Sequence, residues 1–381
     1  MIYLDNAATT FPKPREVLER MVEVYGRLGV SPGRGSYDLA VEAEQLVAET
    51  RCKLANFFGA PDPDRVIFAS NATDALNLAI QGIVKQGDHV VSTCLEHNSV
   101  LRPLYHLREQ GRITYDLVPF DSRGFVDPQD VARAIRPNTS LVIVTHASNV
   151  LGTIQPVQDI ASLCAERGVP LLIDTAQSAG QVPIDMEGWG VSAIAFTGHK
   201  SLLGPTGIGG LICSPDLKIE STRFGGTGVD SKNLVHTPTF PNRLEAGTLN
   251  MLGIIGLAAG LDYLQKEGIV EMRQREMALI RRLIDGLASL PRITLYGSDP
   301  GDNHVPLLSC NIQGLSPTDV GSILDGDYGI AVRTGLHCAP LVHTGLSTIS
   351  TGAVRFSLGY STTEEEVNLA IEAMAEISGG H

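Results

Sequence analysis

The stretch that decides the fold is VPLLIDTAQSAGQVPIDMEGWGVSAIAFTGHK, residues 169–200. It contains two short apolar runs rich in β-branched residues, at 169–174 and 193–197, which predict two buried strands. The first run ends in Asp174, and a histidine and Lys200 follow the second. In open α/β sheets, ligands bind beyond the carboxyl ends of the strands, so these polar residues are candidate site residues.

The same alternation of strand and helix patterns continues on the N-terminal side. Strand-like runs at 65–68, 89–92 and 141–145 are followed by helical patterns at 73–85, 98–110 and 157–167. This alternation predicts a mostly parallel sheet covered by helices, so the fold class is α/β. On the C-terminal side, residues 253–290 predict one long helix, and strand-like pieces at 307–312 and 354–358 predict a smaller α+β domain.

Composition and charge limit the possible partners. The chain has 381 residues, of which 43% are hydrophobic and 19% charged, as is typical of a folded protein with two or three domains. Its formal net charge of -13 disfavours binding to the phosphate backbone of nucleic acids and to anionic lipid, so we expect neither a nucleic-acid nor a membrane partner. The longest apolar tracts are shorter than the roughly 18 residues that span a bilayer.

The N-terminus and the cysteines indicate a reducing compartment. Met1–Leu4 runs directly into Asp5, which is unlike a secretory signal, so we expect a cytoplasmic protein. Six cysteines are scattered without a CxxC pair, which predicts neither a disulfide framework nor a metal site; they are Cys52, Cys94, Cys164, Cys213, Cys310 and Cys338.

An acid and a lysine at neighbouring strand ends suit pyridoxal phosphate chemistry. Such enzymes need a lysine for the Schiff base and an acid that keeps the pyridine nitrogen protonated, and Asp174 and Lys200 could fill these roles. The alternative for Asp174 is a helix cap or a solvated loop residue. Thr73 and backbone N–H groups at a third strand end could hold a phosphate, although an ordinary cap by Ser70 or Asn71 explains that segment equally well. His97 and Asn149 follow two further strands, and a lone loop histidine is more often a surface residue.

Eight segments, in order, resemble the cysteine desulfurases of the class V aminotransferase group. They are Tyr3–Ala8, Glu96–His97, Ser148–Gly152, Asp174–Gln177, Thr197–Lys200, Gly204–Gly209, Arg243–Thr248 and Arg333–Cys338. The last segment, RTGLHC, is similar to the loop of the Suf-type subgroup. The resemblance covers nearly the whole chain and implies the fold type I of pyridoxal-phosphate-dependent transferases. It implies a large cofactor-binding domain at 15–260, a small C-terminal domain at 261–381, and a segment 1–14 that packs near the active site.

The resemblance also implies the activity and the partners. The expected reaction removes sulfur from L-cysteine, which gives L-alanine and a persulfide on Cys338. The expected cofactor is pyridoxal 5'-phosphate, and the expected assembly is a homodimer. Sulfur would then pass to an acceptor protein, for sulfur mobilisation such as iron–sulfur cluster assembly.

The resemblance carries roles to individual residues. Lys200 resembles the Schiff-base lysine, Asp174 the partner of the pyridine nitrogen, and Gln177 the partner of the ring hydroxyl. His97 would stack on the ring and move protons. The positions that match phosphate-binding residues are Ala72, Thr73, Thr197 and His199, with Thr248 supplied by the other subunit. Arg355 matches the arginine that binds the substrate carboxylate, and Asn149 a residue near the cofactor and that carboxylate.

Cys338 decides the reaction. It follows His337 and lies near Arg333, and cationic neighbours lower the pKa of a thiol, so we expect Cys338 to be the nucleophile. The alternative is a buried structural cysteine, which we favour for Cys52, Cys164, Cys213 and Cys310. Cys94 is expected to border the pocket without taking part. Leu336 and Asn98 depart from the histidines that are usual in the Suf-type subgroup, which leaves the acceptor and the exact substrate open.

Two other functions remain open at this point. One is a selenocysteine lyase or another class V enzyme (an aminotransferase, an epimerase or a C–S lyase) in which Cys338 is structural. The other is a sulfur-binding scaffold without activity, against which Lys200, Asp174 and His97 argue.

Overall fold

The computed structural model of the chain describes residues 1–33, 35–229, 231–297, 301 and 303–379. Its centre is a seven-stranded sheet in the order β2-β8-β7-β6-β5-β3-β4. The strands are β2 (Val66–Ala69), β3 (Asp88–Thr93), β4 (Ile113–Val118), β5 (Thr139–Thr145), β6 (Leu171–Asp174), β7 (Ala193–Thr197) and β8 (Gly209–Cys213). Only the pairs that β8 makes with β2 and β7 are antiparallel. The predicted mostly parallel α/β sheet is therefore confirmed.

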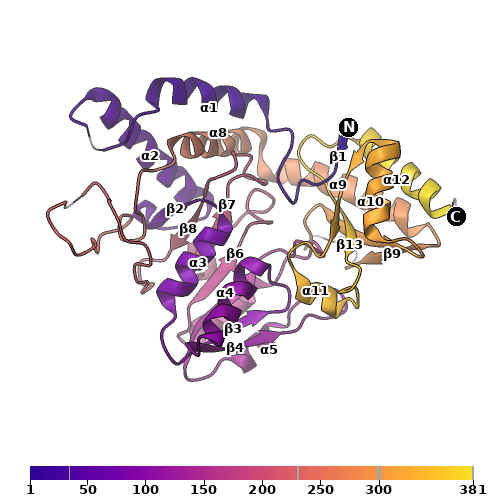
Figure 1. The fold of residues 1–381 in the computed structure, drawn as a ribbon, viewed down its shortest axis with the longest axis horizontal. Helices are drawn as coiled ribbons and strands as arrows, with labels where there is room; N and C mark the ends of the chain where they lie inside the picture. Colours follow the sequence, from indigo (N-terminus) through magenta and orange to yellow (C-terminus); the bar gives the residue numbers. More distant parts are fainter. Residues whose placement is uncertain (34, 230, 298–300, 302, 380–381) are drawn as a thin grey trace.

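Helices bury both faces of this sheet. Alternate residues of β5 show the pattern, because Val142 and Val144 belong to one hydrophobic cluster and Ile143 to the other. The helices are α1 (Arg15–Leu28), α2 (Asp38–Phe57), α3 (Ala72–Ile83), α4 (Asn98–Glu109), α5 (Pro128–Ala134), α6 (Val157–Glu166), α7 (Met186–Trp189) and α8 (Met251–Glu267). In Figure 1, α3 and α4 lie across the front of the sheet, and α1 packs on α8 at the top.

The predicted single helix over 253–290 is wrong. The structure has two helices, α8 and α9 (Ile269–Ala288), which are separated by Gly268. Gly268 has a φ of 77°, in the left-handed region that favours glycine, and its N–H donates to the carbonyl of Leu264 at the end of α8. The chain therefore turns there, and α9 leads into the C-terminal region.

A smaller antiparallel sheet with helices forms this C-terminal region. Its strands are β9 (Ile293–Tyr296), β10 (Leu307–Ile312), β12 (Arg333–Gly335) and β13 (Ala353–Ser357), in the order β12-β13-β10-β9. Together with α9, α10 (Pro317–Tyr328) and α12 (Glu364–Gly379), they enclose a hydrophobic cluster of their own. The predicted α+β character is confirmed. The expected domain boundary between 260 and 261 lies within α8, and the division into two domains remains a prediction.

The N-terminal segment connects the two sheets. β1 (Ile2–Tyr3) pairs in parallel with β11 (Ile330–Ala331), beside the small sheet. The chain then crosses to the large sheet, where Thr10 N–H donates to the carbonyl of His199 at 3.2 Å. Within the described part of the chain, no helix is both long enough and apolar enough to cross a membrane.

Candidate active site

A cavity of about 320 Å³ lies at the carboxyl ends of β5, β6 and β7, where the N-terminal segment and the small sheet face the large one. Every residue predicted for the site contributes to its wall, with the exception of Thr248. These lining residues are Ala72, Thr73, His97, Asn149, Asp174, Gln177, Thr197, His199, Lys200, Cys338 and Arg355.

Asp174 and Lys200 both line the cavity, and their charges attract each other. Asp174 ends β6, is 4% exposed, and accepts a hydrogen bond from Ala176 N–H at 2.9 Å. Burial raises the pKa of Asp174, and the nearby Lys200 opposes that shift. Burial also lowers the pKa of Lys200 to about 8. The buried acid gains from a cationic partner, and the amine loses its proton far more readily than a lysine in water.

The backbone holds Lys200 in a tight turn after β7. The N–H of Leu203 donates to the Lys200 carbonyl at 2.8 Å. The preceding carbonyl, of His199, accepts from the Thr9 hydroxyl at 3.0 Å, from Thr10 N–H at 3.2 Å, and from the Lys13 ammonium. Three donors on one carbonyl oxygen fix the peptide that carries Lys200.

The start of α3 provides free N–H groups and a hydroxyl at one end of the cavity. Asn71 caps this helix, because its side chain accepts from Asp74 N–H at 2.9 Å. The first two N–H groups, of Ala72 and Thr73, come before the first intrahelical bond and can bind an anion. The Thr73 hydroxyl lies 2.6 Å from that of Ser99. The ordinary cap and the anion-binding arrangement therefore coexist.

Unpartnered polar atoms lie close to this end. Among the described residues, Thr197 Oγ1 and His199 Nδ1 are buried without a hydrogen-bond partner. Burial lowers the pKa of His199 to about 4, and Lys200 and Lys13 add to the shift. His199 is therefore neutral at pH 7 and can donate from one ring nitrogen.

These residues fit pyridoxal phosphate. The helix start, the hydroxyls and the unpartnered atoms suit its phosphate, whereas the buried carboxylate of Asp174 suits its ring nitrogen. Gln177 already donates from Nε2 to the carbonyl of Ala7 at 3.1 Å, and this amide has a second hydrogen. The residues that could hold this cofactor thus lie around one cavity.

His97 is the N-cap of α4 and is neutral. Its Nδ1 accepts from the N–H of Ser99 at 3.0 Å, so the neutral ring carries its proton on Nε2. Burial lowers the pKa of His97 to about 4, with Lys200 the largest of the nearby cations that add to the shift. At neutral pH, the neutral ring of His97 can therefore donate a hydrogen bond from Nε2–H.

Arg355 and Asn149 form the wall on the side of the small sheet. Arg355 is 2% exposed, and its Nη1 donates to the carbonyl of Asn149 at 3.0 Å. The side chain of Asn149 donates in turn to the carbonyl of His337 at 2.6 Å. The guanidinium group of Arg355 is thus fixed at the cavity wall, and Asn149 links it to the loop that carries Cys338.

Cys338 lies in the loop between β12 and α11 (Pro340–Gly345) and is exposed. Both His337 and Cys338 adopt the left-handed region, with φ of 49° and 57°, a conformation that costs an L-residue roughly 1–2 kcal/mol. Asn98 N–H holds the carbonyl of Cys338 at 2.7 Å. Because this contact uses the backbone, it does not depend on the residue type at position 98.

The expected cationic role of His337 is wrong. Burial lowers the pKa of His337 to about 2, and its Nε2 bonds to the carbonyl of Ala353 at 3.2 Å. His337 is therefore neutral and supplies no charge to the thiol. The cations at the cavity wall are Arg333, Arg355 and Lys200.

The other cysteines differ from one another in burial. Burial raises the pKa of Cys164, Cys213 and Cys310 to about 12, as fits structural residues. Cys52 is exposed, so the expectation that it is buried is wrong. Cys94 is half-buried, and its pKa is raised first by burial and then by the negative charge of Glu96. Cys94 is not among the described residues that line the cavity, so the expectation that it borders the pocket is wrong.

Several lining residues were not predicted as site residues. Arg333 and His337 belong to the RTGLHC segment, which predicted them only as cationic neighbours of Cys338. Ser99 lies two residues after His97 and contacts both His97 and Thr73, at 2.7 and 2.6 Å. Ala7 and Ala8 come from the Tyr3–Ala8 segment. The motif segments contain Arg333, His337, Ala7 and Ala8 but not Ser99, and no spacing rule identified the individual side chains.

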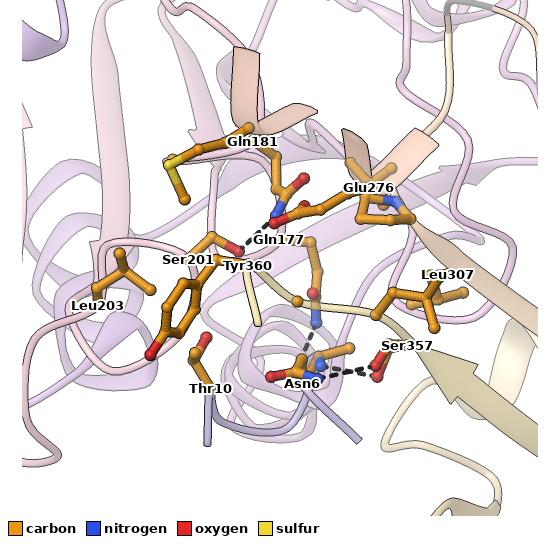
Figure 2. Close-up of a pocket in the computed structure, with 17 residues that line it drawn as sticks. Asn6, Thr10, Gln177, Gln181, Ser201, Leu203, Glu276, Leu307, Ser357 and Tyr360 are labelled. Carbon is orange, nitrogen blue, oxygen red and sulfur yellow. Dashed lines mark hydrogen bonds between the residues drawn. The ribbon is translucent and has the colours of Figure 1, made fainter. Parts of the chain in front are cut away.

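A second, smaller cavity adjoins the first and shares Ala7 and Gln177 with it (Figure 2). Its volume of about 20 Å³ is near that of one water molecule. Gln181 donates to the Ser201 hydroxyl at 3.0 Å there, and Glu276 of α9 faces them. Neither a cofactor nor an amino acid fits in this space.

Thr248 lies apart from the site within one chain. It is exposed and lines a separate cavity with Arg51 and Glu245. Its expected role needs a second subunit, and that role remains a prediction.

Sequence comparison identifies related proteins over the whole chain. Residues 2–369 match the family described as Aminotransferase class-V. A probable cysteine desulfurase from Methanothermobacter thermautotrophicus is 39% identical, over 99% of this chain and 95% of its own length. A cysteine desulfurase from Yersinia pseudotuberculosis is 32% identical, over 99% and 93% of the two chains.

Solved structures are similar over the same length. The apo structure of a cysteine desulfurase from Thermococcus onnurineus NA1 has a TM-score of 0.93 and 34% identity, and the match covers 100% of this chain and 95% of that one. The cysteine desulfurase CsdA (S-sulfonic acid) from Escherichia coli has a TM-score of 0.87 and 27% identity, over 97% and 93%.

Proposed function

Because this chain belongs to the class-V aminotransferase family and is a cysteine desulfurase, we propose that Lys200, Cys338 and Arg355 carry out that reaction on one bound L-cysteine. The observation that carries the proposal is their convergence. A half-buried lysine, an exposed cysteine and a buried arginine, from three distant parts of the chain, line one cavity of about 320 Å³.

The family is dependent on pyridoxal phosphate, and we infer that this chain binds it in the cavity. When bound, this cofactor supplies an aldehyde that condenses with amines and a ring that withdraws electrons from the substrate Cα. Lys200 would hold it covalently, Asp174 would pair with its ring nitrogen, and Gln177 would donate to its ring oxygen. Its phosphate would be held by Ala72, Thr73, Thr197 and His199.

Arg355 and Lys200 would act on the substrate backbone. The guanidinium of Arg355 binds the α-carboxylate, which only arginine can grip with two parallel N–H groups. The Lys200 amine takes the Cα proton, because its pKa of about 8 leaves a useful fraction neutral at physiological pH. Asn149 holds Arg355 and the loop of Cys338 in fixed positions relative to each other through its two hydrogen bonds.

Cys338 would perform the sulfur chemistry. Its thiolate attacks the substrate sulfur, a new S–S bond forms, and the C–S bond breaks. The electron pair of that bond stays with the substrate Cβ, which takes up one proton, in balance with the proton that Cys338 loses on forming its thiolate. Lys200 returns its proton to Cα, and L-alanine results. His97 would donate a hydrogen bond from Nε2–H toward the reacting groups in the cavity, since its Nδ1 is occupied by Ser99 N–H. A persulfide remains on Cys338.

We further propose that the enzyme is a homodimer. Between β8 and α8 the chain extends away from the body of the molecule (Figure 1). This segment exposes large apolar side chains, with Phe224 73%, Val235 74% and Leu234 103% exposed. Such a patch suits a protein interface. A second copy seated there would bring its Thr248 toward the phosphate end of the site.

We propose that the sulfur then passes to an acceptor protein, a step that the exposure of Cys338 supports. A thiol at the mouth of the cavity can be reached by the thiol of another protein after the persulfide has formed. The free cysteines of the chain favour a reducing compartment, so we propose a cytoplasmic location.

The test compares three proteins for alanine, sulfide and cofactor absorbance. With L-cysteine, the wild type should form alanine, and Lys200→Ala should form none and lose covalent attachment of the cofactor. Cys338→Ala should still bind L-cysteine and shift the absorbance, but release almost no alanine. It should retain far more activity on selenocysteine, whose weaker C–Se bond can break without an enzyme nucleophile. Equal loss on both substrates with no spectral shift would mean that Cys338 only supports the fold.

A further inference from the structure

The N-terminal segment brings a carboxylate to Arg355. Asp5 Oδ1 accepts from Arg355 Nη2 at 2.9 Å, and Asp5 Oδ2 lies 3.9 Å from Arg333 Nη1. The side chains of Asp5 and Arg355 are 17% and 3% exposed. One carboxylate therefore lies between two guanidinium groups at the wall of the cavity.

The backbone fixes the place of Asp5. Asp5 forms a parallel bridge with Ser357, which lies on the same strand as Arg355 and two residues after it. The backbone N–H of Asn6 and its side chain both donate to the Ser357 carbonyl, at 3.2 and 3.1 Å, and Ala7 N–H donates to the Ser357 hydroxyl at 2.8 Å. Figure 2 shows Asn6 and Ser357 joined in this way. Asp5 thus has a firm anchor beside Arg355.

The hydrogen bonds of Arg355 leave one edge of its fork available. Nη1 donates to the Asn149 carbonyl, and Nη2 donates to Asp5. Nε is buried and has no partner among the described residues. Since Nη2 carries two hydrogens, the N–H groups that remain to donate to a second carboxylate are those of Nε and Nη2, and their use does not displace Asp5.

The charges of this cluster also suit one added anion. Arg333, Asp5 and Arg355 together carry a net single positive charge. One substrate carboxylate neutralises it. Without Asp5, two guanidinium groups would face the same small space, and Arg355 would lose the carboxylate that holds its plane.

We propose that Asp5 is a positioning residue for the substrate carboxylate, which it serves by fixing the Arg355 guanidinium while the Nε–H stays without another acceptor. This inference rests on the proposed function of Arg355. Asp5 does not touch the substrate, and its effect passes through the guanidinium. It therefore sets affinity for ligands that have an α-carboxylate and leaves affinity for simple amines unchanged.

The test measures ligand binding to the holoenzyme from the change in cofactor absorbance. L-alanine serves as the probe with a carboxylate, and ethylamine as the control without one. Asp5→Ala should weaken L-alanine binding about tenfold, as expected for a lost charge-assisted hydrogen bond, and change ethylamine binding less than about twofold. Asp5→Asn keeps an oxygen acceptor for Nη2 and should restore L-alanine binding to within about threefold of the wild type. Asp5→Ser, which is too short to reach Nη2, replaces Asp5→Ala if that variant does not fold.

A double variant shows whether Asp5 acts through Arg355. In an Arg355→Met background, Asp5→Ala should have no further effect on L-alanine binding. A further tenfold loss there, or equal weakening of both ligands in Asp5→Ala, would overturn the inference. If Arg355→Met weakens L-alanine binding but Asp5→Ala does not, only this inference fails. If Arg355→Met itself leaves L-alanine binding unchanged, the proposed role of Arg355 fails first and Asp5 has no carboxylate to position.

Discussion

Burial raises the pKa of Asp174 and lowers that of Lys200, and each shift supports the proposed chemistry. The raised pKa of Asp174 means that burial disfavours its charged form, so the carboxylate gains from a cation beside it, and a protonated ring nitrogen would be that cation. The lowered pKa of Lys200 means that its neutral amine is available. The same low-polarity surroundings therefore prepare both residues.

Removal of the charge at Asp174 should abolish most of the rate. We expect Asp174→Asn, which keeps the shape of the side chain, to lower kcat about a thousandfold, as loss of an electrostatic contribution of about 4 kcal/mol would. Asp174→Glu retains the charge and should recover part of the rate. The measurement is alanine formation with saturating pyridoxal phosphate. Near-normal turnover of Asp174→Asn would contradict the role.

The pKa of Lys200 can be read from the reaction of apo-protein with pyridoxal phosphate. Only the neutral amine reacts, and the pKa is lowered from 10.5 to about 8. The rate of covalent attachment should therefore rise with pH up to about 8 and then level off. Nα-acetyl-lysine, as the control amine, should keep rising toward its ordinary pKa. A protein profile that follows the control would show that Lys200 is not perturbed.

At the scale of elements, the strands were predictable because burial leaves a clear pattern. The predicted bounds 193–197 and 307–312 are those of β7 and β10, since both strands are almost wholly buried and begin with apolar residues. α2 was not predicted, because its buried face consists largely of small residues such as Ala40 and Ala43, which give a weak apolar signal. The break at Gly268 was missed because one glycine within a helical pattern is usually tolerated.

The candidate site was predictable wherever a residue stands at a strand end or in a motif. Asp174, Lys200 and Cys338 are of this kind. The contact between Asp5 and Arg355 is different, because it arises from the pairing of β1 with β11 and the bridge to Ser357. That pairing joins opposite ends of the chain, and no local spacing contains it.

Helix α9 carries a buried acid that should make stability depend on pH. Burial raises the pKa of Glu276 from 4.5 to about 7, although a hydrogen bond with the Gln181 side chain opposes this shift. The folded state binds this proton more tightly than the unfolded state, so the stability that it contributes is lost as pH rises from about 4.5 through 7.

Replacement by the neutral isostere should remove this dependence. Glu276→Gln should exceed the wild type in free energy of unfolding by about 3 kcal/mol at pH 8, and by less than about 1 kcal/mol at pH 5. Urea denaturation at the two pH values measures the difference. Glu271→Gln, at an exposed position of the same helix, is the matched control and should show no such dependence. An equal effect of Glu276→Gln at both pH values would contradict the shift.

At the scale of the whole molecule, the site is built from parts that one chain brings together only in its folded form. The large sheet provides Asp174 and Lys200, the small sheet provides Arg355, and the loop before α11 provides Cys338. The N-terminal segment ties the two sheets at His199 and Ser357. Within the described chain, the residue expected for the site that lies elsewhere is Thr248.

A dilution series tests whether a second subunit completes the site. If Thr248 of the partner contacts the phosphate, cofactor loss should follow dissociation of the dimer, and Thr248→Val should lose cofactor at higher protein concentration than the wild type. Analytical ultracentrifugation with cofactor absorbance measures both quantities together. Thr239→Val, an exposed threonine of the same segment, is the control. A monomer that keeps its cofactor and full activity would contradict the dimeric site.

The most direct test of the central claim is the position of sulfur after one turnover. The wild-type holoenzyme is mixed with L-cysteine without an acceptor, and its peptides are examined by mass spectrometry under non-reducing conditions. The peptide that contains Cys338 should gain the mass of one sulfur atom, in proportion to the alanine released. Sulfur on the peptide of Cys94 or the exposed Cys52, or alanine without any added sulfur on Cys338, would contradict Cys338 as the nucleophile.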